Sequence, residues 1–264
     1  MRLLVDLGNT RLRWAVLGDD GTLGRPAAVV HGGRPLEPVL DAAWSGLAVP
    51  EAVLACTVAG GEAAAALAGW CRRRWGVEVM PARAAAAGWG VRNAYHEPER
   101  LGADRWAALV AARGLFPGRP VCIVDCGTAV TVDALAADGA HLGGLIAPGL
   151  ALMRRALAAG TAGVAEADAL GGRPQEVALL ARSTRDAVTA GTLHCLAAFV
   201  ARAGADVGGA LGPGTVRVLT GGDAPALLSL LDEGWRHEPV LVLRGLARMA
   251  LEPPADREAR GTSP

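Results

Sequence analysis

The sequence predicts an α/β protein made of two similar halves, and three observations support this prediction. An apolar strand, a turn rich in Asp, Gly and Thr, and an alternating second strand occur near residue 6 and again near residue 125. Apolar runs with strand character alternate with helical segments along most of the chain. The 264 residues suffice for two domains of roughly 130 residues each. Two such halves facing each other would form a cleft, where small ligands usually bind.

The first half opens with an apolar strand at residues 3–5, the turn at 6–10 and an alternating strand at 11–17. Gly18-Asp19-Asp20-Gly21 is typical of a hairpin turn. The elements expected next are a helix at 36–45, a strand at 52–56, a helix at 61–75 and a helix at 101–114, which Pro117 and Gly118 end. The stretch 23–47 is short and Pro/Gly-rich, which predicts a first domain trimmed at its edge, without effect on the site residues named below.

The second half repeats this order after a boundary expected near residues 117–120. The expected elements are strands at 121–124, 129–135 and 141–146, helices at 148–158 and 182–203, a strand at 216–220 and a helix from Ala224. The residues after Leu251 are rich in Pro, Gly and charge, which predicts a frayed tail.

The composition excludes several classes of function. Apolar residues make up 52% and the formal net charge is 0, which indicates a globular protein and argues against binding nucleic acid or membranes through bulk charge. All 26 Lys and Arg residues are Arg, so a phosphate loop of the Walker type and Schiff-base chemistry, which both need Lys, are excluded. The five scattered cysteines predict reduced thiols in the cytoplasm, and no apolar stretch approaches the ~20 residues of a membrane span.

The two turns have the residue types of a phosphate-binding loop. In Asp6-Leu7-Gly8-Asn9-Thr10 and in Asp125-Cys126-Gly127-Thr128, a glycine two positions after the Asp lets backbone N–H groups approach a phosphate closely. The Asp follows a strand, where it could hold Mg²⁺ or its waters. The alternative is a pair of tight hairpin turns, in which the same residue types are common. The matched context of the two motifs favours phosphate binding.

Two further motifs have both a functional and a structural interpretation. Thr220-Gly221-Gly222-Asp223-Ala224, between a strand and a helix, could bring an adenosine ring close to the backbone, or Asp223 could simply cap the helix. Gly102-Ala103-Asp104-Arg105 begins an apolar helix. Asp104 could act there as a general base beside a substrate-orienting arginine, or the pair could only cap the helix N-terminus.

These motifs occur in the same order as in type III pantothenate kinases, which the chain resembles from residue 3 to about residue 250. Gly143-Gly144-x-Ile146-x-Pro148-Gly149, Asn93-Ala94-Tyr95-x-x-Pro98 and Leu241-x-Leu243-x-Gly245-Leu246 add to the resemblance. The resemblance implies two duplicated ribonuclease-H-like (actin-like ATPase) domains at residues 1–117 and 118–252, with a nucleotide cleft between them and a tail at 253–264. It also implies ATP-dependent phosphorylation of pantothenate to 4'-phosphopantothenate, the first step of coenzyme A biosynthesis.

The resemblance also assigns site residues. It implies that Asp104 accepts the proton of the substrate hydroxyl, that Asp125 binds a monovalent cation (K⁺ or NH₄⁺), and that Thr128 contacts ATP. The other nucleotide contacts it implies are Asp6, Leu7, Gly8, Asn9, Thr10, Arg11, Leu12 and Arg13. The pantothenate contacts it implies are Tyr95, Gly102, Ala103, Asp104, Arg105 and Thr184, with Ser183 as the alternative to Thr184.

The cofactors implied are ATP with Mg²⁺ and the monovalent cation, and the implied assembly is a cytoplasmic homodimer without nucleic-acid or membrane partners. The histidines match no catalytic position, and we expect them to be structural or solvated, with His96 and His194 nearest to the site. Two other functions compete with this one: an accessory binding protein on the same fold, and a kinase for another small hydroxylated substrate.

Overall fold

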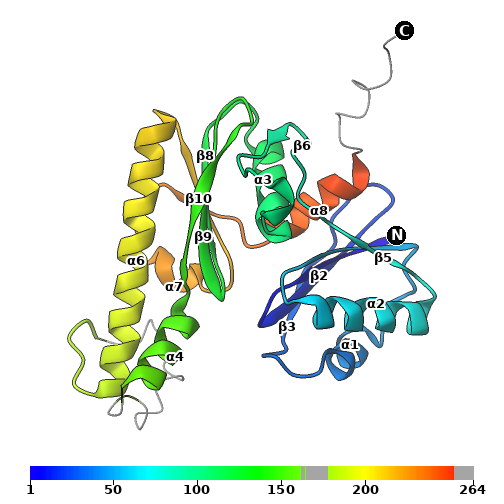
Figure 1. The fold of residues 1–264 in the computed structure, drawn as a ribbon, viewed down its shortest axis with the longest axis horizontal. Coiled ribbons are helices and arrows are strands. Elements are labelled where there is room, and N and C mark those ends of the chain that lie inside the picture. The colour runs from blue at the N-terminus through cyan, green and yellow to red at the C-terminus, as the bar shows by residue number, and fades with distance from the viewer. Residues whose placement is uncertain (162–163, 165–177, 253–264) are drawn as a thin grey trace. The chain divides into compact units, whose positions relative to one another are not determined.

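The structure is a computed structural model that describes residues 1–161, 164 and 178–252. The chain forms two compact units (Figure 1). Of the described residues, the first unit contains 1–118, 139–141 and 240–252, and the second contains 119–138, 142–161, 164 and 178–239. The predicted domain limits at 117/118 and 252 stay a prediction. The units differ from them because residues 240–252 pack with the first unit, and the predicted tail at 253–264 lies outside the described residues.

The first unit is built on a five-stranded sheet of order β3-β2-β1-β4-β5. Its strands are β1 (Arg2–Leu7), β2 (Arg11–Leu17), β3 (Ala27–Val30), β4 (Ala52–Thr57) and β5 (Val79–Pro81). β1 pairs antiparallel with β2 and parallel with β4, so β1 is the central strand. Residues 3–7 are all buried, as a strand covered on both faces requires.

Helices cover this sheet. The helices α1 (Leu36–Trp44) and α2 (Gly61–Trp75) lie together over it (Figure 1), and their apolar side chains form one core cluster with residues of β1 and β4. The helices α3 (Ala103–Leu115) and α8 (Leu241–Leu251) pack against each other and against β1 and β4. Gly245 of α8 lies on the backbone of Ala107, where any Cβ would overlap the Ala107 carbonyl. This close approach places α8 in the first unit.

The second unit repeats the strand order of the first. Its strands are β8 (Val121–Cys126), β9 (Ala129–Leu135), β10 (His141–Pro148), β11 (Val216–Thr220) and β12 (Trp235–His237), in the order β10-β9-β8-β11-β12. β8 again pairs antiparallel with the next strand and parallel with a later one. The helices are α4 (Leu150–Gly160), α6 (Thr184–Leu211) and α7 (Ala224–Leu228). The matching strand orders confirm the predicted duplicated α/β architecture.

The helix α6 is longer than expected and has an unusual composition. It continues eight residues beyond the predicted end at 203, through Gly208 and Gly209. Within the described part of the chain it is the one helix long and apolar enough to cross a membrane, which qualifies the expectation that no stretch reaches that length. Half of its apolar window is buried, and Leu193, Leu196 and Val200 belong to the core of the second unit. These contacts are those of a core helix.

The remaining elements of the first unit are short. They are β6 (Ala87–Gly88), β7 (Val91–Arg92) and the 3₁₀ turn Pro98–Arg100. β6 and β7 pair as a small antiparallel ribbon. These elements connect β5 to α3 and carry Tyr95 between them, so they set the position of that side chain.

Candidate active site

The first turn lies between β1 and β2, and Asp6 precedes it on β1, the central strand of the sheet. Asp6 pairs across the sheet with Arg13 on β2 and with Cys56 on β4. Its side chain is almost fully buried, and its carboxylate lies 3.8 Å from Arg13 Nη1. The thiol of Cys56 donates a hydrogen bond to Asp6 Oδ1 over 3.3 Å. The carboxylate is therefore held from both neighbouring strands.

The surroundings of Asp6 shift its protonation. Burial raises the pKa of Asp6 to about 6; Arg13 opposes this rise, the nearby carboxylate of Asp104 adds to it, and the Cys56 hydrogen bond reduces it. Burial, together with Asp6 and Asp104, raises the pKa of the Cys56 thiol well above its ordinary value, so Cys56 stays protonated and can donate. Sequence reasoning gave Cys56 no role, because a lone cysteine in an apolar strand carries no signal of its own.

Five of the predicted nucleotide residues after Asp6 fall into two groups. Gly8, Asn9 and Thr10 form the turn itself, and the Gly8 N–H donates to the Arg11 carbonyl over 3.0 Å. Leu7 and Leu12 are fully buried in the core of the unit. Their side chains pack the sheet, so only their backbone could contact a ligand.

The helix α3 brings Asp104 near Asp6, although the two residues are far apart in the sequence. Asp104 is the second residue of α3, and its Oδ1 accepts from the Arg105 N–H over 2.8 Å. The carboxylate lies over Gly102, where a Cβ would come within 2.5 Å of Oδ1. The fold thus joins the predicted base and the first turn within one unit, and the helix N-terminus favours the charged form of a carboxylate.

Arg105 has a different position from the one expected of a substrate anchor. It is buried, with 6% of its surface exposed, and its Nη1 donates to the Tyr95 hydroxyl over 2.6 Å. The guanidinium also lies over the Tyr95 ring, and His141 stacks on that ring. In this structure Arg105 holds Tyr95. His141 lies beside the predicted substrate residues, whereas the sequence suggested His96 and His194 as the nearest histidines.

The second turn, between β8 and β9, is shaped by close backbone contacts. Asp125 pairs with Thr220 on β11, and the next residue, Gly221, has a φ of 96°. A Cβ on Gly221 would overlap the Cys126 carbonyl and lie 2.5 Å from Asp125 Oδ1. The Thr220–Asp223 motif therefore packs directly on the second turn, because the Asp223 N–H also donates to the Cys126 carbonyl over 3.0 Å.

The helix α4 begins at the same turn. The Gly149 N–H donates to the Thr128 carbonyl over 3.0 Å, and a Cβ on Gly149 would overlap the Gly127 carbonyl. The N-terminus of an 11-residue helix thus lies against Gly127 and Thr128. Helix N-termini stabilise anions, so this geometry suits the phosphate contact expected of Thr128.

Comparison with known proteins shows the family of this chain. The family model of type III pantothenate kinase matches residues 2–205. A type III pantothenate kinase of Nitrosococcus oceani is 45% identical over 95% of this chain and 94% of that protein, and one of Halorhodospira halophila is 41% identical over 93% and 96%. The chain belongs to the type III pantothenate kinase family. The resemblance seen in the motifs is thereby confirmed.

Solved structures agree on the fold of this pantothenate kinase family member. An ethanolamine utilization protein EutJ of Carboxydothermus hydrogenoformans matches with a TM-score of 0.55 at 17% identity, over 93% of this chain and 88% of that one. A ROK family glucokinase of Streptomyces griseus, solved with glucose and AMPPNP, matches with a TM-score of 0.51 at 14% identity, over 94% and 98%. At these identities the likeness shows the fold alone, and it agrees with the predicted fold of two similar α/β domains.

Arg154 is a kinase-site candidate that sequence reasoning missed. This side chain of α4 is 7% exposed, and its Nε donates to Thr192 Oγ1 of α6 over 3.2 Å. Its Nη2 is buried without a hydrogen-bond partner in the described part of the chain. Burial lowers the pKa of Arg154, and Asp223 opposes this. A buried cation thus lies in the electrostatic range of Asp223, which itself contacts the second turn.

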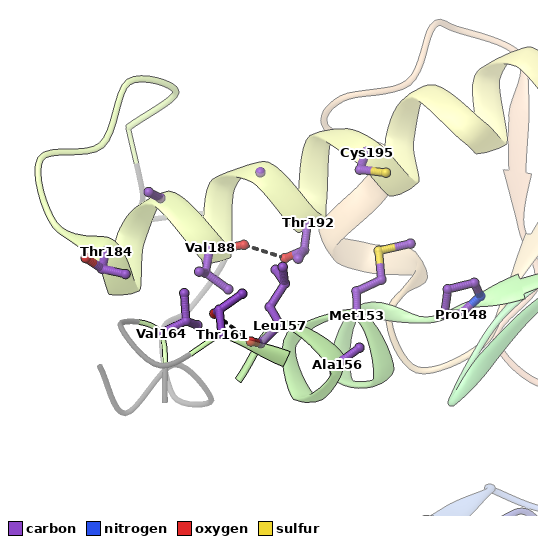
Figure 2. Close-up of a pocket in the computed structure, with 12 residues that line it drawn as sticks. Pro148, Met153, Ala156, Leu157, Thr161, Val164, Thr184, Val188, Thr192 and Cys195 are labelled. Atoms are coloured by element: carbon purple, nitrogen blue, oxygen red, sulfur yellow. Dashed lines mark hydrogen bonds between the residues drawn. The ribbon is translucent and has the colours of Figure 1, made fainter. Parts of the chain in front are cut away.

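Thr184, expected to contact pantothenate, lines a cavity of about 770 Å³ between α4 and α6 (Figure 2). Most of the lining is apolar, with Met153, Leu157 and Val188 among the side chains that point into it. The neighbouring Ser183 caps α6, because its Oγ accepts from the Asp186 N–H over 3.1 Å. Ser183 is thus engaged in the fold, which favours Thr184 as the residue able to contact a ligand.

The donor groups fit ions that are held mainly by phosphate oxygens and water. In the segments that the structure describes, no three His, Cys, Asp or Glu side chains gather as a metal cluster. Each turn instead presents one aspartate, Asp6 or Asp125, beside backbone groups. Mg²⁺ beside nucleotides typically uses only one or two protein carboxylates. The residues present therefore suit a cation that arrives with its nucleotide.

Proposed function

We propose that this protein transfers the terminal phosphate of ATP to the primary hydroxyl of pantothenate, which forms 4'-phosphopantothenate and begins coenzyme A biosynthesis. The observation that carries the proposal is the pair of carboxylates Asp6 and Asp104, which the first unit brings within electrostatic range of each other. Asp6 lies on β1 directly before a phosphate-type turn, and Asp104 lies in the first turn of α3, so a site for the phosphate donor and a proton acceptor would be close together.

Asp104 accepts the proton of the substrate hydroxyl in this proposal. Its backbone is fixed at the start of α3, and the Arg105 N–H orients one carboxylate oxygen. The second oxygen is the one we assign to the hydroxyl proton. Tyr95, held by Arg105 and His141, forms one wall for the substrate, together with Gly102 and Ala103. Most of the rate comes from positioning and from charge stabilisation, as is general for phosphoryl transfer.

The two turns bind the nucleotide. Residues 6–13 bind the β- and γ-phosphates, Thr128 adds a hydroxyl contact, and Gly221 and Gly222 accept the adenosine against the backbone. Asp6 would hold Mg²⁺ or its waters, and Asp125 would hold K⁺ or NH₄⁺. When bound, these ions would supply the positive charge that neutralises the phosphates, because this chain has no lysine for that purpose.

The proposed assembly is a homodimer in the cytoplasm without nucleic-acid or membrane partners. The cysteines support a reducing compartment, because Cys56, Cys71, Cys122, Cys126 and Cys195 are all free thiols and the first four are buried. The zero net charge gives no bulk attraction for nucleic acid. Thr184 remains the proposed substrate contact from the second unit.

A coupled assay of ADP release tests the proposal, with and without pantothenate, in K⁺ and then in Na⁺ alone. We expect turnover that requires pantothenate and is faster in K⁺. Turnover with another small alcohol but not with pantothenate would show the chain to be a kinase for a different substrate. Nucleotide binding with no turnover at all would favour an accessory binding protein.

Replacing the base tests the assignment of Asp104. Asp104→Asn should lower kcat by about 10²- to 10⁴-fold, because the amide cannot accept the hydroxyl proton, and should leave ATP binding largely intact. The matched control is Asp206→Asn, which removes only an exposed ion pair to Arg202. Retained turnover in Asp104→Asn would remove this residue from the mechanism.

A further inference from the structure

The first turn is supported by a side chain from outside its motif. His31 follows β3, and its Nε2 lies 2.8 Å from the Gly8 carbonyl oxygen. The His31 and Gly32 N–H groups both donate to the Thr10 carbonyl, over 2.9 and 3.1 Å. Only 5% of His31 is exposed. One residue and its neighbour therefore engage two of the carbonyl groups of the turn.

The tautomer of His31 follows from the hydrogen bond at its other ring nitrogen, Nδ1. The Gly33 N–H donates to Nδ1 over 3.3 Å, so Nδ1 is the acceptor and Nε2 carries the hydrogen that is donated to Gly8. Gly32 and Gly33 have φ values of 59° and 79°. This left-handed backbone, which glycine adopts readily, folds the two N–H groups back toward Thr10 and the ring.

The direction of these carbonyls matters for an anion. A peptide unit is planar and trans, so its C=O and the following N–H point in opposite directions. When His31 binds the Gly8 carbonyl, it therefore fixes the Asn9 N–H to point away from the ring. A carbonyl oxygen turned toward a phosphate would repel it, whereas an N–H turned toward it binds. Asn9 is exposed, which places the turn at the surface of the unit.

We propose that His31 is a positioning residue for nucleotide binding: its Nε2–H turns the Gly8 carbonyl away and so aims the Asn9 N–H at a phosphate of ATP. This inference rests on the proposed function, in which residues 6–13 bind the phosphates. His31 itself does not touch the nucleotide. Because the Asn9 N–H binds a phosphate, the contribution of His31 to ligand affinity increases with the number of phosphates on the ligand. It is absent for adenosine.

Three variants separate the hydrogen bond from the bulk of the ring. His31→Gln places an amide N–H near the position of Nε2 and keeps the donor. His31→Asn reaches only the position of Nδ1, and His31→Phe keeps the ring without any donor. The control is His237→Phe, an exposed histidine of β12. The affinity for ATP, ADP, AMP and adenosine is measured by calorimetry, and KM and kcat are measured with ATP and pantothenate.

We expect His31→Phe and His31→Asn to bind ATP about five- to tenfold more weakly, the effect of one lost hydrogen bond, with KM for pantothenate and kcat within about twofold of wild type. His31→Gln should recover most of the affinity, and adenosine should bind all variants equally. Equal weakening of ATP and adenosine, or failure of Gln to restore affinity, would overturn the proposal. If the Phe variant does not fold, the Gln and Asn pair decides the question.

One more variant separates this inference from the proposed function. Thr10→Val removes a hydroxyl of the turn itself and should raise KM for ATP. If it does so while the His31 variants bind ATP like wild type, only the role of His31 is overturned. If Thr10→Val also binds ATP like wild type, the first turn is not the phosphate site, and both the assignment of the turn and the inference are overturned.

Discussion

The two phosphate-type turns occupy equivalent places in their sheets but are held by different means. In the first, side chains from other segments hold the turn: Arg13 and Cys56 hold Asp6, and the His31 ring holds the Gly8 carbonyl. In the second, glycines allow backbone to lie on backbone, with Gly149 against Gly127 and Gly221 against Cys126. The two copies of the motif thus share one topology but differ in the contacts that hold the turn.

This difference teaches which changes each turn can tolerate. A turn held by side chains loses one hydrogen bond at a time when a side chain is replaced, and each loss is modest. A turn held by glycines has no room for any added atom, so a single methyl group disrupts it. We therefore expect larger losses of stability from small substitutions in the second turn and more graded losses of function in the first.

The largest effect is expected from Gly221→Ala. The added Cβ overlaps the Cys126 carbonyl, and the residue must keep a φ of 96°, so the free energy of unfolding should fall by at least about 3 kcal/mol. Chemical unfolding followed by circular dichroism measures this. Gly208→Ala in α6 is the control, because nothing lies within 4 Å of its Cβ and alanine favours a helix. Equal stability of the two variants would contradict the contrast between the turns.

Asp6→Asn should separate function from stability in the first turn. The pKa of Asp6 is about 6 in the folded protein against 3.8 for the free group, so the folded state holds this proton more tightly. Stability due to this group is present below pH 3.8 and is lost as the pH rises through 6, by up to about 3 kcal/mol. In Asp6→Asn the free energy of unfolding does not fall in this way as the pH rises. The variant also lacks the attraction between Asp6 and Arg13, which offsets part of its gain in stability.

We therefore expect Asp6→Asn to be inactive and, relative to wild type, more stable at pH 7.5 than at pH 4.5. Urea unfolding of both proteins at the two pH values measures the difference. A relative stability that is the same at both pH values would show that Asp6 titrates normally in the folded protein.

The smallest effect is expected at Cys56. Cys56→Ala removes the thiol donor to Asp6 and should lower kcat/KM for ATP by about three- to fivefold, because a thiol hydrogen bond is weak. Cys56→Ser supplies a stronger donor and should retain wild-type activity or exceed it. Cys71→Ala, a buried thiol of α2, serves as the packing control. Equal activities of the Ala and Ser variants would show that Cys56 only fills space.

Much of the fold could be predicted from the sequence, because the repeated strand, turn and strand have strong local signals. The strands β3, β5 and β12 were missed, since each has only three or four residues and too few positions to show a period. The place of α8 could not be predicted, because it depends on Gly245 meeting Ala107 across more than a hundred residues of sequence.

The candidate site was predicted unevenly. Asp6, Asp104 and Asp125 stand out in motifs, and their roles came from the family resemblance. His31 did not stand out, because it lies in the Pro/Gly-rich stretch that we expected to be a trimmed edge without effect on the named site residues. The structure shows that this stretch contacts two of those residues, since His31 hydrogen-bonds to Gly8 and Thr10. The hydrogen bonds of His31 depend on the pairing of β2 with β3, which no local sequence pattern predicts.

The packing of α8 on α3 has a consequence for how the chain folds as it is synthesised. The first unit begins at Met1, yet Leu241, Leu243 and Leu246 of α8 are buried within it. A ribosome that has made residues 1–239 has supplied the whole second unit but has not yet supplied α8. The half that is translated first is therefore completed last, and until then the surface of α3 that α8 will cover remains open.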